Sequence, residues 1–442
     1  MDGFFIMTSG TTDNIQAPGE RTPVRFQTLS CVAAGWSVLA MSLHLWPFEG
    51  RHSLEVAAPA NLGIMLWVFI ATAMAVFSRR VCQMIRGCLP NVGVWAFLVV
   101  AASSAAFSPN EGQSLLSLAK LALMYVGAFV LFGVVCKRDG WAGRLCIMAL
   151  AAACIAMIAS VVSRLLEYQG FGFFANPYKY GTATAILFVL GITYLASRQD
   201  KWAWLVVPVS ALAIVATVSL GGLFGIVVGL VIGIAVAKRS ARLRLAICLS
   251  VMVVVLAIGW QTSLLSHLCD DVRISEPNGH DVRQRYIEWQ AQLNLLEARP
   301  VAGTGLGCIN EYRSAFYGRL PKLNTLAPFD RNGWLLVAAE TGIFGLVAFV
   351  WLIVSSGRGA WRLTRADSPQ VELGVAAVAA LAAACAANTF SSVNYNGVVN
   401  AFVLVLALAH HAGRVTPGEQ NTEVISLSTI ASSPVADRRD NE

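Results

Sequence analysis

The amino-acid sequence predicts an all-α polytopic membrane protein with about twelve transmembrane helices and one large polar loop between the ninth and the tenth. Hydrophobic residues make up 56% of the 442-residue chain, and charged residues make up 13%, compared with about 25% in soluble domains. Apolar runs long enough to cross a bilayer recur along the chain. Basic residues are concentrated in alternate connections between these runs, which is typical of multipass membrane proteins.

The predicted spans form one group before the polar loop and a second group after it. The first group covers residues 26–46, 56–78, 92–107, 114–135, 145–163, 181–196, 203–218, 220–237 and 243–260. The second group covers residues 333–355, 370–389 and 396–411. Several runs are shorter than the roughly 20 residues that a bilayer requires. We therefore expect the true helix ends to differ from these bounds by several positions.

Five segments follow from these spans. They are an N-terminal tail at 1–25, helices one to nine at 26–260, a polar loop with an amphipathic helix at 261–332, helices ten to twelve at 333–411, and a C-terminal tail at 412–442. Both tails are rich in polar residues and poor in aromatic ones, a composition that favours disorder. We therefore expect the chemistry to reside between them.

Lysine and arginine residues in the short connections between spans predict the orientation of the chain in the membrane. Fifteen of them lie in alternate connections: Arg79, Arg80, Arg86, Lys137, Arg138, Arg144, Arg198, Lys201, Lys238, Arg239, Arg242, Arg244, Arg358, Arg362 and Arg365. The opposite short connections hold only Arg51, Arg164 and Lys179. Because cytoplasmic connections carry the basic excess, we expect both termini in the cytoplasm and loop 261–332 on the other side. This distribution accounts for most of the net charge of +7, so nucleic acid is not expected as a partner.

The large loop contains basic and acidic residues in equal number. They are Arg273, Arg283, Arg285, Arg299, Arg313, Arg319, Lys322, Arg331, Asp270, Asp271, Glu276, Asp281, Glu288, Glu297, Glu311 and Asp330. A structureless loop of this length would be unusual, so we expect ordered elements in it. Residues 281–297 predict an amphipathic helix, in which Asp281 and Gln284 resemble a capping box and after which Pro300 prevents continuation.

This predicted helix has two faces of interest. Its apolar stripe consists of Tyr286, Trp289, Leu293 and Leu296. We expect the stripe to rest on the helix bundle or on the membrane surface. Arg285 and Glu288 lie one turn apart on a neighbouring face, where they are either a solvent-exposed ion pair or part of a site.

Three glycines, Gly303, Gly305 and Gly307, follow the amphipathic helix. Closely spaced glycines can cradle a phosphate, but the surrounding sequence has neither a Walker lysine nor a Rossmann acid. A backbone turn that closes over the bundle is therefore the preferred interpretation. Cys308 in this turn and Cys269 earlier in the loop form either a disulfide, in an oxidising compartment, or two unpaired thiols.

The tenth span begins after Asp330, Arg331 and Asn332. Asp330 or Asn332 is expected to cap the helix. The positive end of the helix dipole and the Arg331 guanidinium would together form an anion site, and the alternative is an arginine that only extends toward the lipid headgroups. Lys120 and Glu340 lie within predicted spans, where ionisable groups are costly. Each is expected to form an internal pair or to contact a substrate.

The segment 281–345 resembles the O-antigen ligase and Wzy-type polysaccharide polymerase superfamily. The matching residues are, in order, Arg285, Trp289, Pro300, Gly303, Gly305, Gly307, Asn332, Glu340, Gly342 and Gly345. Earlier, FANPYKYG at 174–181 looks like the family's NPN turn, and TVSLGG at 217–222 looks like its T-x-S-R-G segment. Arg331 stands where the family usually has histidine, and Leu220 stands where it has arginine.

The resemblance implies a glycosyltransferase of the bacterial inner membrane that joins polyprenyl-pyrophosphate-linked oligosaccharide repeat units at the periplasmic face, in exopolysaccharide or O-antigen biosynthesis. Neither a cofactor nor a metal ion is expected. The implied partners are the lipid-linked donor, a glycan acceptor, membrane lipid, a flippase and a chain-length regulator. An O-antigen ligase that transfers glycan to lipid A-core is the alternative within the family, and a multipass transporter is the alternative from another class.

This activity implies roles for particular residues. Pyrophosphate suits arginine forks, so Arg331 and Arg285 are expected to clamp it. A guanidinium stays protonated and cannot act as a base, so a base would be Glu288, Asp330 or His280. The further residues expected to contact substrate are Arg283, Lys120, Asn332, Lys179 and Glu340.

Overall fold

The computed structural model describes residues 21–40, 59–138, 140–165, 177–198, 204, 220–261, 280–312, 332–365, 370–390 and 398–412. Within these ranges the regular elements are helices and no strand occurs, which confirms the all-α class. Four helices are long and apolar enough to cross a membrane: Glu111–Cys136, Trp141–Ile158, Arg239–Ile258 and Gly333–Arg365. Shorter apolar helices accompany them, so the described chain is consistent with a membrane protein.

The first half of the chain forms the helices α1 (Arg21–Ala40), α2 (Pro59–Phe77), α3 (Arg79–Arg86), α4 (Val92–Ala106), α5 (Glu111–Ala122), the π-helix η2 (Leu123–Ala128), α6 (Phe129–Cys136), α7 (Trp141–Leu165) and α8 (Pro177–Ser197). The short helix α3 was not predicted. It begins at a serine cap, because the Ser78 side chain accepts a hydrogen bond from the amide of Val81. Its arginines Arg79 and Arg86 are exposed.

The second half forms α10 (Leu220–Val236), α11 (Arg239–Gln261), α13 (His280–Ala298), α14 (Ile309–Tyr312), α15 (Gly333–Arg365), α16 (Val371–Ala387) and α17 (Val398–Ala412). Helices thus occur at the predicted spans except 203–218, which lies outside the described residues apart from residue 204. The total of twelve spans remains a prediction. α15 extends ten residues beyond the predicted end at 355.

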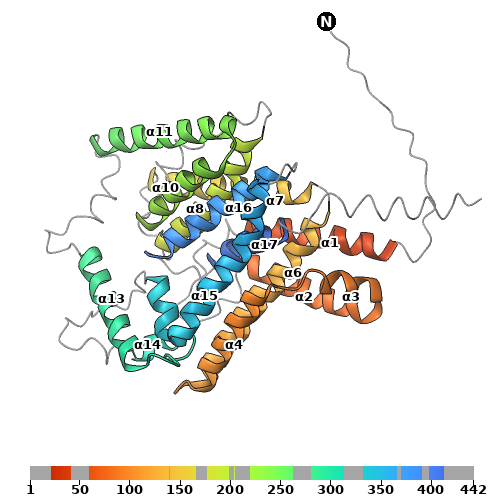
Figure 1. Ribbon diagram of the computed structural model, residues 1–442, viewed down its shortest axis with the longest axis vertical. Coiled ribbons are helices and arrows are strands. Elements are labelled where there is room, and N and C mark those ends of the chain that lie inside the picture. The colour runs from red at the N-terminus through yellow and green to blue at the C-terminus, as the bar shows by residue number, and fades with distance from the viewer. Residues whose placement is uncertain are drawn as a thin grey trace, which may run out of the picture.

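Small residues allow the central helices to pack closely. α8, α10 and α16 lie side by side in Figure 1. A methyl group added at Gly229 of α10 would come within 3.0 Å of the Ala379 carbonyl oxygen of α16. Without a hydrophobic driving force between helices in lipid, such backbone proximity supplies the dispersion contacts that hold a bundle together. The alanine-rich sequence of α16 is therefore a packing surface.

α15 is interrupted at Gly342, whose φ of 73° lies in the left-handed region. In an uninterrupted helix, the amide of Ile343 would donate to the carbonyl of Ala339, four residues earlier. Here it donates instead to the Pro300 carbonyl oxygen at 2.8 Å. The Ala339 oxygen accepts from the amide of Thr304 at 3.0 Å. Backbone groups of α15 and of the turn at residues 299–308, hereafter the glycine turn, thus satisfy each other.

The glycine turn also contacts the connection between α4 and α5. The hydroxyl of Ser108 donates to the Thr304 carbonyl oxygen at 2.9 Å. The hydroxyl of Ser104 lies 2.7 Å from the carbonyl oxygens of both Ala302 and Glu340. The amides of residues 303–305 are used within the protein, so the structure confirms a backbone turn and not a phosphate cradle. Cys308 is buried in this turn, and its predicted partner Cys269 lies outside the described residues.

Gly342→Ala is expected to destabilise the protein by several kcal/mol. A Cβ atom at this residue would overlap the Val301 carbonyl oxygen, and the left-handed φ alone costs a non-glycine residue about 1–3 kcal/mol. The measurement is thermal unfolding of the purified protein in detergent. Gly112→Ala in α5 is the matched control, because a Cβ atom there meets no atom within 4 Å. Equal melting temperatures for the two variants would contradict this account of the kink.

Candidate functional site

Segments that are distant in sequence meet at one end of the bundle. Figure 1 shows α13, α14 and the beginning of α15 together there. Leu295 of α13 packs with Ile309 of α14 and with Leu336 and Ala339 of α15. The glycine turn joins this group to the connection between α4 and α5 through the serine hydrogen bonds. The predicted site residues that the structure describes are distributed around this junction.

α13 closely matches the predicted helix but buries a different face. The buried side chains are Ile287, Glu288, Ala291, Gln292 and Leu295. Tyr286 is 62% exposed and Leu293 is 38% exposed, so of the two predicted alternatives the helix bundle is excluded for these two residues. On the buried face, Leu295 packs against Leu336 and Ala339 of α15. A contact of Tyr286 with the membrane surface stays a prediction.

Glu288 is 0% exposed. The interpretation as a solvent-exposed ion pair is therefore wrong for this carboxylate. Acidic side chains are almost never fully buried in proteins without a specific interaction, because removing a carboxylate from water is costly. Burial places Glu288 on the inner side of α13, two turns before Leu295 of the junction.

Gln292 lies one turn after Glu288 on the same face of α13 and is 1% exposed. Within the described part of the chain, neither atom of its side-chain amide has a hydrogen-bond partner, and the indole nitrogen of Trp289 has none either. Buried polar groups are bonded in the large majority of cases, and each one left unsatisfied costs about 1–3 kcal/mol. Sequence inspection missed Gln292, because its only signal was the four-residue spacing from Glu288.

Asn332, one of the two residues predicted to cap the tenth span, caps α15. Its side-chain oxygen accepts from the amides of Trp334 at 3.0 Å and Leu335 at 3.2 Å. The amide of Gly333 donates to the Asn388 carbonyl oxygen at 2.7 Å, and the amide of Leu336 donates to the Asn332 carbonyl oxygen. The first amides of α15 therefore already have acceptors. The helix dipole remains at this end, but an anion there would have to be bound by side chains.

Lys120 is half-buried in the last turn of α5, directly before the π-helix η2. It lies two turns after Gln113, whose side-chain nitrogen donates to the Gly307 carbonyl oxygen at 2.9 Å, and these two residues share a helix face. In the described ranges Lys120 forms no ion pair or hydrogen bond, so the expected internal pair is not found there. Single π-helical turns are frequent at functional sites.

Glu340 is buried at the kink of α15, and its carbonyl oxygen accepts from the amide of Gly305 at 2.9 Å. Arg331 and Asp330 lie outside the described residues. The same holds for the side chains of four further candidates, His280, Arg283, Arg285 and Lys179. The first three belong to α13, and Lys179 belongs to α8. Among the described residues, no group of three His, Cys, Asp or Glu side chains is placed to hold a metal ion.

Comparison with known families concerns this same region. Residues 204–350 match the family model for O-antigen ligases. The match includes α10, α11, α13, the glycine turn and the first half of α15, and therefore Glu288, Gln292, Asn332 and Glu340. Lys120 precedes it, and no curated protein matches the chain. The matched segment contains the junction described above, and the match supports the resemblance of this segment to the O-antigen ligase and Wzy-type polysaccharide polymerase superfamily.

Proposed function

We propose that the protein is a polymerase that joins polyprenyl-pyrophosphate-linked oligosaccharide repeat units at the periplasmic face of the bacterial inner membrane. Members of the matched family transfer glycans, and the described helices suit a membrane protein. The observation that carries the proposal is the inner face of α13, where the Glu288 carboxylate and the Gln292 amide are buried, together with the buried indole nitrogen of the neighbouring Trp289.

This face suits a hydroxyl-rich ligand. A sugar ring presents neighbouring hydroxyl groups that both donate and accept hydrogen bonds. The Gln292 amide offers a carbonyl acceptor and an NH2 donor in one plane, and the indole nitrogen of Trp289 adds a second donor. A few convergent polar groups among apolar side chains are typical of small-molecule sites. Sugar hydroxyls would thus relieve the cost of leaving these groups buried without partners.

The reaction requires an acceptor hydroxyl and a leaving group. The hydroxyl oxygen attacks the anomeric carbon of the donor glycan, the bond from that carbon to the pyrophosphate oxygen breaks, and the pyrophosphate departs on its polyprenyl chain. The hydroxyl proton passes to a base. We assign this role to Glu288, with Asp330 and His280 as alternatives, because Glu288 is at the junction and lies three residues after Arg285. Burial brings a base and its substrate together without competing water.

Side-chain cations would stabilise the departing pyrophosphate. We assign Arg331 and Arg285 to this role, with Arg283, Lys120 and Lys179 as further contacts. The support comes from α15, whose first amides are occupied by Asn332 and Asn388 and cannot also bind phosphate oxygens. Guanidinium groups form paired charge-assisted hydrogen bonds with phosphate, which suits this task. Lys120 adds a cation that has no partner within the described chain.

A second candidate is an O-antigen ligase, because the matched family model carries that description. The two activities share the donor and differ in the acceptor, which is a second lipid-linked glycan for a polymerase and lipid A-core for a ligase. We prefer the polymerase because the Gly-Trp pair that follows Asn332 resembles exopolysaccharide polymerases more than ligases. A flippase and a chain-length regulator are the partners that such a pathway implies.

Purified protein supplied with a defined lipid-linked repeat unit is expected to produce a ladder of longer lipid-linked glycans, resolved by electrophoresis or mass spectrometry. Addition of lipid A-core separates the two candidates. A polymerase yields the ladder without it, whereas a ligase modifies the core and leaves the repeat units unjoined. Unchanged lipid in both reactions would refute the proposed function.

Arg331→Ala is expected to abolish polymer formation while the protein remains in the membrane, because the pyrophosphate would lose a bidentate partner. The measurement is the amount of polymer made by a deletion strain that expresses the variant. The amount of the variant protein is determined in the membrane fraction. Arg331→His tests whether the position accepts the residue that is usual in the family. Near-normal polymer from Arg331→Ala would exclude the assigned role.

Gln292→Leu is expected to lower kcat/KM roughly tenfold or more while the melting temperature rises or stays the same. The substitution removes hydrogen bonds to the glycan, worth about 1–3 kcal/mol, and also removes a buried amide that lacks partners in the described chain. Gln290→Leu is the matched control, since Gln290 on another face of α13 bonds to Asn294. A fall in both activity and melting temperature would indicate a structural role for Gln292, and unchanged activity would exclude substrate contact.

A further inference from the structure

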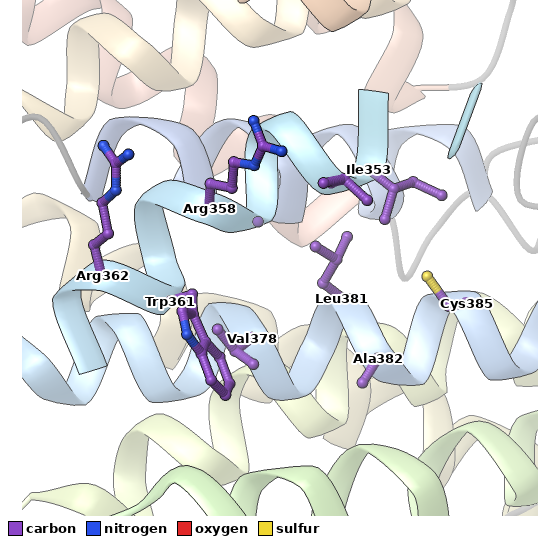
Figure 2. A pocket seen from close by; sticks show the side chains of 10 residues that line it. Ile353, Arg358, Trp361, Arg362, Val378, Leu381, Ala382 and Cys385 are labelled. Carbon is purple, nitrogen blue, oxygen red and sulfur yellow. The ribbon is translucent and has the colours of Figure 1, made fainter. Parts of the chain in front are cut away.

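A groove lies between α15 and α16, away from the junction. It has a volume of about 490 Å³ and is lined by Ile353, Val354, Gly357, Arg358, Trp361, Arg362, Val378, Leu381, Ala382 and Cys385 (Figure 2). Arg358 lies sixteen residues after the kink at Gly342, or roughly 24 Å along the helix axis. The groove includes none of the residues assigned to glycan transfer, so its use is independent of the proposed function.

The groove has a charged end and an apolar end. Figure 2 shows Arg362 and Trp361 toward one end, Arg358 nearer the middle, and Ile353 and Cys385 toward the other end. The remaining lining residues are aliphatic or glycine. This distribution matches an amphiphile with one charged group and a long apolar part.

The same side of α15 is an exposed apolar surface. Phe344, Val347, Trp351 and Val354 are all exposed and recur at helical spacing. In a helix that is long and apolar enough to cross a membrane, such a surface faces acyl chains and not water. The groove opens beside Val354, so a lipid of the surrounding bilayer can enter it directly.

The charged end is complementary to an anion. In the described chain, the guanidinium groups of Arg358 and Arg362 have no carboxylate partner. Arg358 instead lies 5.2 Å from the ring centre of Trp351, and Arg365 lies 5.0 Å from that of Trp361. Tryptophan and arginine together are typical of the membrane interface, where they meet lipid headgroups. Because no acidic side chain among the described residues neutralises them, the arginines favour an anionic headgroup over a zwitterionic one.

We propose that this groove binds an anionic phospholipid of the bilayer. The phosphate diester lies at Arg358 and Arg362, and one acyl chain follows Ile353, Leu381 and Cys385. Basic pockets between transmembrane helices are known to bind anionic headgroups. The acyl chain fills space between α15 and α16 that would otherwise lose dispersion contacts.

The test is native mass spectrometry of the purified full chain, titrated with phosphatidylglycerol and, separately, with phosphatidylcholine of the same acyl chains. Phosphatidylglycerol is expected to bind more tightly. The double variant Arg358→Gln/Arg362→Gln should weaken its binding roughly 30-fold, about fivefold for each arginine. Arg79→Gln/Arg86→Gln on α3 removes the same charge from two exposed residues and should leave the affinity unchanged.

A second variant tests the groove itself. Ala382→Phe fills the apolar part and retains both arginines, so it should also reduce phosphatidylglycerol binding. If the double variant does not fold, this variant alone tests whether the lipid binds in the groove. Equal affinity for the two lipids, or loss of binding in the α3 control alone, would overturn the proposal. Displacement of the lipid by inorganic phosphate would show a simple anion site. A dimer that disappears with Ala382→Phe would show that a second copy of the chain occupies the groove.

Discussion

The exchange of backbone hydrogen bonds between α15 and the glycine turn is the interaction on which the rest of the junction depends. A break in a membrane helix exposes amide and carbonyl groups that lipid cannot satisfy, so it persists only where other protein groups replace the lost bonds. Pro300 and Thr304 supply those groups to Ile343 and Ala339. The break thereby fixes the glycine turn, the end of α13 and the connection between α4 and α5 in one arrangement. Gly342 is required because only glycine adopts this backbone conformation without strain.

At the capped end of α15 the first backbone amides already have acceptors, so an anion bound there would be held by side chains. A helix N-terminus with open amides can hold a phosphate by itself, but here Asn332 and Asn388 take those amides. Binding of a pyrophosphate at this place would therefore need cationic side chains. Arginine suits that need in one respect that histidine does not, since its charge is independent of pH. The substitution of Arg331 for the usual histidine is therefore compatible with binding of a leaving group but not with proton transfer by that residue.

On the inner face of α13, the proposed glycan contact would come at a cost in stability. A hydrophobic residue in place of Gln292 would pack at this position without an unsatisfied amide, yet the chain carries glutamine beside the buried Glu288. Violations of local packing rules of this kind are concentrated at functional sites, where a ligand supplies the missing partner. The groove between α15 and α16 shows the opposite case. Its lining is mostly apolar, and its two arginines lie where the headgroup of the proposed lipid would bind.

The sequence by itself determined the class of protein and the places of most of the described helices. Spans are read from hydropathy because lipid solvates apolar side chains over a fixed thickness, and this constraint is local along the chain. Asn332 and Glu340 were also visible in the sequence, because their order and spacing resemble a known family, and Glu288 was visible as the acidic residue three positions after Arg285.

Only the tertiary structure decided how these residues are used. Both faces of α13 contain apolar side chains, so periodicity could not show which face is buried. The packing of Leu295 against α15 decided it. The choice of Asn332 as the cap depended on hydrogen-bond geometry at one end of a helix. The role of the glycine turn depended on the carbonyl groups of Ala339 and Glu340, which lie at the break in α15 and accept hydrogen bonds from the amides of the turn. These outcomes follow from contacts between segments far apart in sequence, for which hydropathy and spacing carry no information.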